Sequence, residues 1–184
     1  MRSLVNFSRL ELASLVCEHL KQAGVNVILS GGSCVSIYSS EKYVSKDLDF
    51  IDVSLSSNKK IARALTELGF ENKPKNSRHF VHADTPLSVE FPSAPLTVGD
   101  EYIPSSAANK LETKHGSLRL LSPTDCVKDR LANFYYFGDA QCLEQAILVA
   151  KTHPINLKSI ERWHNNEGQE NGYANFITKL SSVD

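Results

Sequence analysis

Hydrophobic positions near the start of the chain alternate between helical spacing and continuous short runs. Ser8 and Glu11 have the spacing of an N-terminal capping box, and apolar residues recur at helical intervals after them as far as Gly24. A short apolar run over residues 25–29 follows and is typical of a buried strand. The pattern therefore predicts a helix that ends at a glycine and leads directly into a strand.

A second apolar run follows the first after a glycine turn. Gly31 and Gly32 separate the first strand from residues 33–39, for which we expect a short helix. After a polar loop, residues 48–53 are predicted to form the second strand.

Helices and strands continue to alternate up to residue 92. A serine-rich start and an apolar stripe predict a helix from residue 56 to Gly69. Further short strands are expected at residues 70–72, 80–82 and 87–92, with a polar turn over residues 73–77 between the first two. This order predicts an α/β (α+β) fold with a small mixed sheet flanked by helices.

From Pro123 onward the pattern is helical. Ser122 and Pro123 are typical of a helix start, and a break is expected at residues 138–139. Three more helices are predicted after this break, one with a stripe over residues 143–150 and two over residues 156–164 and 173–180, and residues 163–172 are expected to form a connecting loop. We therefore expect a core over residues 1–121 and a helical region over residues 122–184 that packs on it.

Composition narrows the classes of function. The chain has 184 residues, 41% of them hydrophobic and 22% charged, and a net charge of −1, which argues against a general binder of polyanions. No apolar run approaches the roughly 18 to 20 residues that a membrane span needs, and the N-terminus lacks the apolar core of a signal peptide. The four cysteines lack metal-ligand spacing. A cytoplasmic protein with reduced, buried cysteines is expected.

Two carboxylates lie one residue apart at the start of the second predicted strand. On a strand, Asp47 and Asp49 project from the same face, while Leu48 and Phe50 point to the opposite, buried face. Parallel carboxylates repel each other unless a cation lies between them, and hard oxygen ligands suit Mg²⁺. The simpler alternative is a solvated face of an edge strand.

Neighbouring features favour the cation. The Gly31-Gly32-Ser33 turn offers backbone N–H groups at a predicted helix start, which is where proteins bind phosphate. Glu90 lies on a later apolar strand, so it either faces solvent or shares a cation. Three carboxylates from two neighbouring strands can hold the metal ions of a phosphoryl or nucleotidyl transfer.

These motifs resemble the DNA polymerase β-type nucleotidyltransferase superfamily. Within it the chain is most similar to the AbiEii-like bacterial branch, whose members are often encoded in toxin–antitoxin or phage-defence loci. Residues 122–131, Asp139 and residues 143–146 resemble the helical segment that follows the core in that branch. The resemblance covers roughly residues 25–151.

The resemblance implies a role for each matching residue. Gly31, Gly32 and Ser33 would contact the phosphates of ATP or another nucleoside triphosphate. The catalytic acids that hold Mg²⁺ or Mn²⁺ would be Asp47, Asp49 and Glu90, and Glu90 is alternatively the base for the acceptor hydroxyl. In the helical region, Arg130 and Asp139 would be the basic and acidic nucleotide-binding residues. Only one of Lys128 and Arg130 can point at the nucleotide, because residues two apart on a helix do not share a face.

The implied function is Mg²⁺-dependent transfer of a nucleoside monophosphate to a hydroxyl of RNA (such as tRNA) or protein. No basic residue lies between Gly32 and Ser40 to grip phosphates. This absence favours an alternative, a catalytically silent binding module for a cognate protein partner. A nuclease-like activity with the same carboxylates is a second alternative.

Other chemistry-bearing residues fit simpler explanations. His79 and His82 are three apart and would point to opposite faces of a strand, which disfavours a metal site. The basic residues at 73, 75 and 78 are typical of a solvated turn, and they alternatively guide an RNA acceptor. Trp163 and His164 fit packing at a helix end. The aromatic run over residues 135–137 combines core packing with a surface on which a base can stack.

Overall fold

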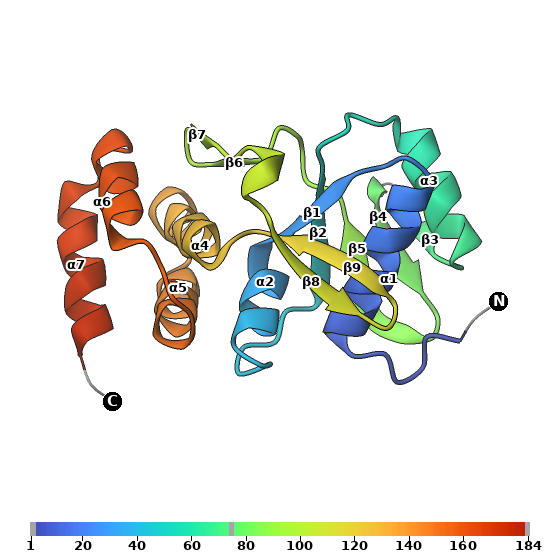
Figure 1. Cartoon of the computed structure of the whole chain (residues 1–184), viewed down its shortest axis with the longest axis horizontal. Helices are drawn as coiled ribbons and strands as arrows, with labels where there is room; N and C mark the ends of the chain where they lie inside the picture. The colour runs from blue at the N-terminus through green and yellow to red at the C-terminus, as the bar shows by residue number, and fades with distance from the viewer. Residues whose placement is uncertain (1–2, 74–75, 183–184) are drawn as a thin grey trace.

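The computed structural model describes residues 3–73 and 76–182. Seven strands form a mixed sheet in the order β3-β4-β5-β2-β1-β9-β8, with β6 and β7 forming a separate hairpin (Figure 1). Strand β2 is parallel to β5, and β1 is parallel to β9, while the other neighbouring strands are antiparallel. The expected α/β architecture, a mixed sheet with flanking helices, is confirmed.

The elements have the following bounds. The helices are α1 (Arg9–Gln22), α2 (Gly31–Tyr38), α3 (Asn58–Glu67), α4 (Pro123–Phe137), α5 (Ala140–Thr152), α6 (Leu157–Asn166) and α7 (Glu170–Ser181), with a short 3₁₀ helix at Ser105–Ala107. The strands are β1 (Val27–Ser30), β2 (Asp47–Asp52), β3 (Glu71–Lys73), β4 (Asn76–His82), β5 (Thr85–Glu90), β6 (Thr97–Val98), β7 (Glu101–Tyr102), β8 (Asn109–Thr113) and β9 (Gly116–Leu120).

The helix boundaries follow the capping residues in the sequence. Ser8 caps α1 with the full capping box to Glu11, and Ser57 and Ser122 cap α3 and α4 through their hydroxyls. Gly138 ends α4 with a φ of 67°, and Asp139 caps α5. The residues that predict the helix starts therefore form capping hydrogen bonds with backbone groups close to them in the chain.

Strands β6 to β9 have no counterpart among the expected elements. The sheet gains β9 as a parallel neighbour of β1, with Leu29 opposite Leu120, and β8 as its outer edge. Edge strand β8 has no fully buried residue. Because such a strand needs no apolar face, its sequence does not show the alternation from which a strand is predicted. In β9, only Leu118 and Leu120 are buried.

The four C-terminal helices lie beyond one end of the sheet, with α6 and α7 farthest from it (Figure 1). The loop expected over residues 163–172 is wrong, because α6 continues to Asn166 and α7 already begins at Glu170. Trp163 is fully buried, and its indole N–H donates to Val98 O at 2.9 Å. This bond ties α6 to the β6–β7 hairpin, a long-range contact that local pattern does not reveal.

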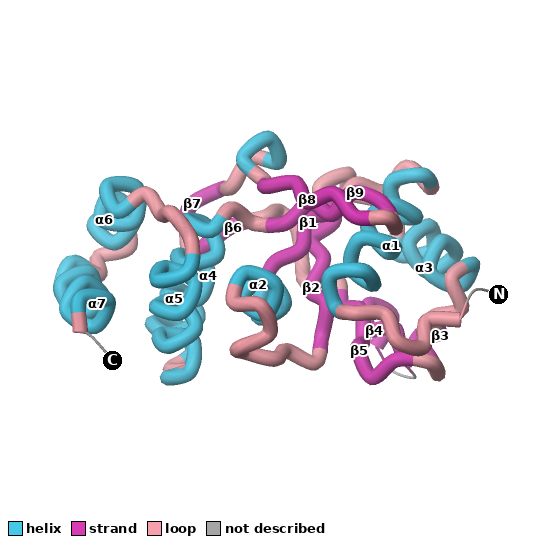
Figure 2. The backbone as a smooth tube through the Cα atoms, turned by 60° about the horizontal axis from the view of Figure 1, so that its bottom comes forward, coloured by secondary structure: helices cyan, strands magenta, loops and turns pink. Residues whose placement is uncertain are grey.

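Helix α2 lies between the sheet and helices α4 and α5 (Figure 2). It starts at Gly31, two residues before the expected start, so both glycines belong to its first turn. The turn expected over residues 73–77 is too long, because β3 includes residue 73 and β4 begins at residue 76; residues 74–75 lie outside the described residues. None of the described helices combines the length and apolar character that crossing a membrane requires.

Candidate functional site

The two aspartates of β2 lie beside β5 at the centre of the sheet. In the parallel register, Asp47 is opposite Ser88 and Asp49 is opposite Glu90. Leu48 is fully buried, whereas both aspartates are partly exposed. Residues opposite each other on paired strands share a face, so the three carboxylates occupy one face of the sheet.

Electrostatic crowding is strongest at Asp49. Burial, followed by the negative charges of Glu90 and Asp47, raises the pKa of Asp49 from its ordinary value of 3.8 to about 7. The positive charge of Arg130 opposes this shift. At neutral pH the site thus holds a carboxyl group poised between its protonated and ionised forms.

Gly31 allows the Asp49 carboxylate to approach the start of α2. Its φ is +66°, a conformation that residues with a side chain rarely adopt. A Cβ at this position would collide with Oδ2 and Cγ of Asp49. The glycine therefore brings the first turn of α2, with its unpaired backbone N–H groups, next to the carboxylates.

Gly32 and Ser33 are packed into the protein rather than open to solvent. A Cβ on Gly32 would lie 3.2 Å from both Ser45 Oγ and the Tyr43 ring. Ser33 is fully buried, and its hydroxyl donates to the backbone O of Asp47. The side chain of Ser33 thus binds strand β2, which leaves the backbone N–H groups of this turn as the groups suited to phosphate.

Arg9 is a supporting residue that sequence reasoning missed. It is 5% exposed, and its guanidinium donates to Ser33 Oγ at 3.1 Å and to Ser45 O at 2.7 Å. An ion pair with Glu41 at 3.1 Å completes its contacts. Arg9 thereby joins α1, α2 and the loop before β2, a role that no local motif around Ser8 and Glu11 indicates.

Helix α4 directs one of its two candidate basic residues at the carboxylates. Arg130 lines a hollow of about 330 Å³ together with Asp49, Gly31, Asn133 and residues 92–93 and 95–97. Its guanidinium also pairs with Asp129 at 2.6 Å. The hollow therefore combines a carboxylate, a helix start and a guanidinium.

Lys128 lies elsewhere. Its ammonium group is buried and bonds both carboxylate oxygens of Glu101, at 3.0 and 3.1 Å. Since Lys128 is absent from the lining of the hollow, only Arg130 of the two faces it.

Asp139 is exposed at the start of α5. It caps that helix by accepting the backbone N–H of Gln141 at 3.0 Å, and it is not among the residues that line the hollow around Asp49. A link to Arg130 runs through Cys142, whose sulfur contacts both side chains. The expected nucleotide-binding role of Asp139 stays a prediction.

Two of the three carboxylates, Asp47 and Glu90, have side-chain partners on β5 and β4. Ser88 donates its hydroxyl to Asp47 Oδ1, and His79 Nδ1 contacts Glu90 Oε1. Within residues 3–73 and 76–182, no group of three or more His, Cys, Asp or Glu side chains is arranged to hold a metal ion. The donor types nevertheless fit Mg²⁺ or Mn²⁺, because all are carboxylate oxygens whose mutual repulsion at Asp49 a divalent cation would relieve.

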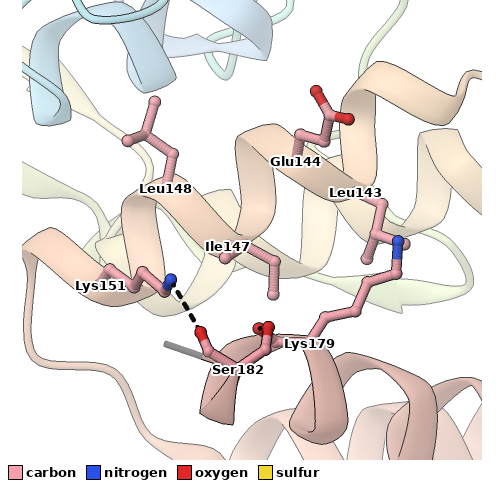
Figure 3. Close-up of a pocket in the computed structure, with 7 residues that line it drawn as sticks. All are labelled: Leu143, Glu144, Ile147, Leu148, Lys151, Lys179 and Ser182. Carbon is pink, nitrogen blue, oxygen red and sulfur yellow. Dashed lines mark hydrogen bonds between the residues drawn. The ribbon is translucent and has the colours of Figure 1, made fainter. Parts of the chain in front are cut away.

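Two other hollows differ in their relation to the carboxylates. One of about 410 Å³ shares Thr97, Asp129 and Asn133 with the first, and Tyr136 and Phe137 line its far side. Another of about 470 Å³ lies between α5 and α7, with an apolar floor and two lysines (Figure 3). Of these two, only the hollow of about 410 Å³ adjoins the hollow around Asp49.

The remaining candidate residues are divided between packing and solvent. Trp163 and His164 are buried, as expected for helix packing, and Tyr135 OH bonds His164 at 3.0 Å. Tyr136 and Phe137 are 51% and 80% exposed, which leaves a base-stacking role open as a prediction. Of the basic turn, residue 75 lies outside the described residues.

Comparisons with solved structures identify the fold. An antigenic nucleotidyltransferase-like protein from Paracoccidioides brasiliensis matches with a TM-score of 0.55 and 13% identity, over 80% of this chain and 78% of the other. The solution structure of the antibiotic-resistance factor ANT(2'')-Ia matches with a TM-score of 0.54 and 10% identity, over 94% of both chains. A crystal structure of ANT(2'')-Ia with adenylyl-2''-tobramycin matches with a TM-score of 0.51 and 11% identity, over 90% and 95%.

The chain thus has the nucleotidyltransferase fold. At these identities the likeness shows the fold alone. No family model matches the sequence, and no curated protein matches it either. The AbiEii-like branch stays an expectation from the sequence.

Proposed function

We propose that this protein is a Mg²⁺-dependent nucleotidyltransferase that moves a nucleoside monophosphate from a nucleoside triphosphate to an acceptor hydroxyl. The observation that carries the proposal is the placement of Asp47, Asp49 and Glu90 on one face of the sheet, where burial of Asp49 and then the charges of Glu90 and Asp47 raise the pKa of Asp49 to about 7. Carboxylates so placed favour a divalent cation. The nucleotidyltransferase fold adds support.

The residues of the chain divide the work of binding. Asp47, Asp49 and Glu90 would hold Mg²⁺ or Mn²⁺, which when bound neutralises charge on the phosphates. The backbone N–H groups of residues 31–33 bind phosphate oxygens at the start of α2. Arg130 faces the same hollow and adds a positive charge that a phosphate can contact.

In the transfer itself, the acceptor oxygen bonds to the α-phosphorus of the triphosphate as pyrophosphate leaves. Glu90, if it is not occupied as a metal ligand, takes the hydroxyl proton. The hollow beside Asp129 and Asn133 offers the acceptor a route to the same place. We propose RNA or protein as the acceptor, and a cytoplasmic role in toxin–antitoxin or phage-defence systems, on the resemblance of residues 122–131 to the AbiEii-like branch. The structure of ANT(2'')-Ia in complex with adenylyl-2''-tobramycin supports transfer of a nucleoside monophosphate as a reaction that this fold can host.

Calorimetric titration with the four nucleoside triphosphates, with and without Mg²⁺, tests the proposal. We expect Mg²⁺-dependent binding of at least one triphosphate by the wild-type protein, and its loss in the variant Asp47→Asn/Asp49→Asn. A far-ultraviolet circular dichroism melt confirms that the variant is folded. Absence of binding to wild type, or equal binding by the folded variant, would overturn the proposal.

The silent binding module is the competing function. It draws support from the lack of a basic residue between Gly32 and Ser40, and from the engagement of Asp47 and Glu90 by neighbouring side chains. A wild-type protein that binds no triphosphate but captures a partner protein would establish it. Pyrophosphate release with a heavier acceptor separates a transferase from a nuclease.

A further inference from the structure

A row of polar residues crosses four strands of the sheet at the site. His79 on β4 is opposite Glu90 on β5, Glu90 is opposite Asp49 on β2, and Asp49 is opposite Ser30 on β1. Opposite residues on paired strands share a face. His79 therefore extends the row of candidate metal ligands by one strand.

The His79 ring is fixed against Glu90. Its side chain is 11% exposed, and Nδ1 contacts Glu90 Oε1. An ionised carboxylate only accepts hydrogen bonds, so Nδ1 carries the proton of this contact. The bond uses one carboxylate oxygen and leaves the other for a cation or an acceptor proton.

The stability of the fold does not account for this histidine. His79 Nε2 is buried and has no hydrogen-bond partner, which costs free energy. Nor does Glu90 need a protein donor for solvation, because its side chain is 35% exposed and can reach water. A group that is retained at such a cost calls for a functional explanation.

We propose that His79 is a positioning residue that holds the Glu90 carboxylate in line with Asp49 through its Nδ1–H. This inference rests on the proposed function, in which Glu90 is a metal ligand or the base. Without the histidine, the partly exposed Glu90 side chain is free to rotate towards water. Partners of this kind around metal-binding carboxylates typically change metal affinity by about 10- to 100-fold when they are removed.

His82 on the same strand is the matched control. It is as buried as His79, at 9% exposed for each residue, and its Nε2 also lacks a partner. Its Nδ1, however, accepts the backbone N–H of Asp84 at 3.0 Å, and its ring packs on Phe70. It lies opposite Thr85 and not Glu90, so it is not part of the row. Any general effect of removing a buried histidine from β4 appears in both variants.

The test measures Mg²⁺-dependent triphosphate binding by calorimetry in His79→Leu, His79→Asn and His82→Leu. We expect His79→Leu to weaken binding about tenfold or more, and His82→Leu to leave it unchanged. His79→Asn keeps an N–H donor near the position of Nδ1 and should bind within about threefold of wild type. Equal affinity of His79→Leu and wild type, or an equal loss in His82→Leu, overturns the positioning role.

A second measurement needs no variant and no ligand. Long-range ¹H–¹⁵N spectra of wild-type protein report which imidazole nitrogen carries the proton. We expect a proton on Nδ1 of His79, and a ring protonated only on Nε2 overturns the inference. If wild type binds no triphosphate, the proposed function fails and the positioning role falls with it, whereas wild-type binding that is insensitive to His79→Leu removes the positioning role alone.

Discussion

Asp49 of strand β2 and Arg130 of helix α4 line the same hollow, but different interactions position them. Asp49 and Glu90 are held by strand pairing, in which backbone hydrogen bonds determine the register and hence the face. Arg130 comes from a helix outside the sheet, where the sequence favours it but also offers Lys128 two residues earlier. The two-residue period of each strand determines which face carries the acids. Packing between distant elements determines which basic residue of α4 lies near them.

The difference extends to how each charge is balanced. At Asp49, burial and two neighbouring carboxylates disfavour the ionised form. Lys128 and Arg130 instead find carboxylate partners in Glu101 and Asp129. Asp49 in the sheet region thus lies among like charges, whereas the basic residues of α4 are paired, and this difference is why we propose the cation site in the sheet region.

The largest expected effect is a dependence of stability on pH that arises at Asp49. Its pKa in the folded protein, about 7, lies above the ordinary value of 3.8, so the folded state binds more protons between these values. This contribution to the free energy of unfolding is fully present below about pH 4 and is lost as pH rises through 7, by at most about 4 kcal/mol.

Urea denaturation of Asp49→Asn and wild type at pH 5 and pH 8 measures this contribution. Asparagine cannot ionise, so we expect the variant to lose much less stability than wild type between the two values. Saturating Mg²⁺ should reduce the wild-type loss as well. The same pH dependence in both proteins would show that Asp49 is not the crowded group.

The next effect tests the approach of α2 to Asp49. Gly31→Ala places a Cβ against the carboxylate and strains a φ of +66°, so we expect a loss of about 3 kcal/mol in the free energy of unfolding. Gly138→Ala is the control, because its φ is +67° and a Cβ would meet nothing within 4 Å. It should cost only about 1 kcal/mol. Equal losses would exclude the contact with Asp49.

A smaller effect separates Lys128 from the site. Lys128→Met removes the buried ammonium from Glu101, whose side chain is 29% exposed and can turn to water. We expect a loss of about 2 kcal/mol in unfolding free energy, below the roughly 3 to 5 kcal/mol of a fully buried pair. Triphosphate affinity of the folded variant should equal that of wild type. A large fall in affinity would place Lys128 at the nucleotide instead.

Arg130→Gln should lower the triphosphate affinity, which Lys128→Met leaves unchanged. We expect triphosphate affinity to fall about tenfold, which corresponds to about 1.4 kcal/mol, since a charge-assisted contact to phosphate is removed. Thermal stability should fall as well, because Asp129, whose side chain is only 16% exposed, loses its ion-pair partner, so affinity is measured at a temperature where the variant is folded. Calorimetry on both variants decides which of the two residues contacts nucleotide, and unchanged affinity in Arg130→Gln would remove it from the site.

Local pattern is enough to predict the elements and the faces that carry the acids. The capping residues Ser8, Ser57 and Ser122 define helix starts because their hydroxyls bond within four residues of themselves. The two-residue period of β2 puts Asp47 and Asp49 on the face opposite Leu48. Both features depend only on neighbours in the chain, so the sequence by itself determines them.

Only the tertiary structure decides which distant groups meet these acids. The addition of β8 and β9 to the sheet, the insertion of Arg9 beneath Ser33, and the contact between His79 and Glu90 join residues that lie far apart in the chain or across a register shift. The choice of Arg130 over Lys128 depends on where Glu101 lies. Such partners are selected by packing and electrostatic pairing between elements, for which residue spacing carries no signal.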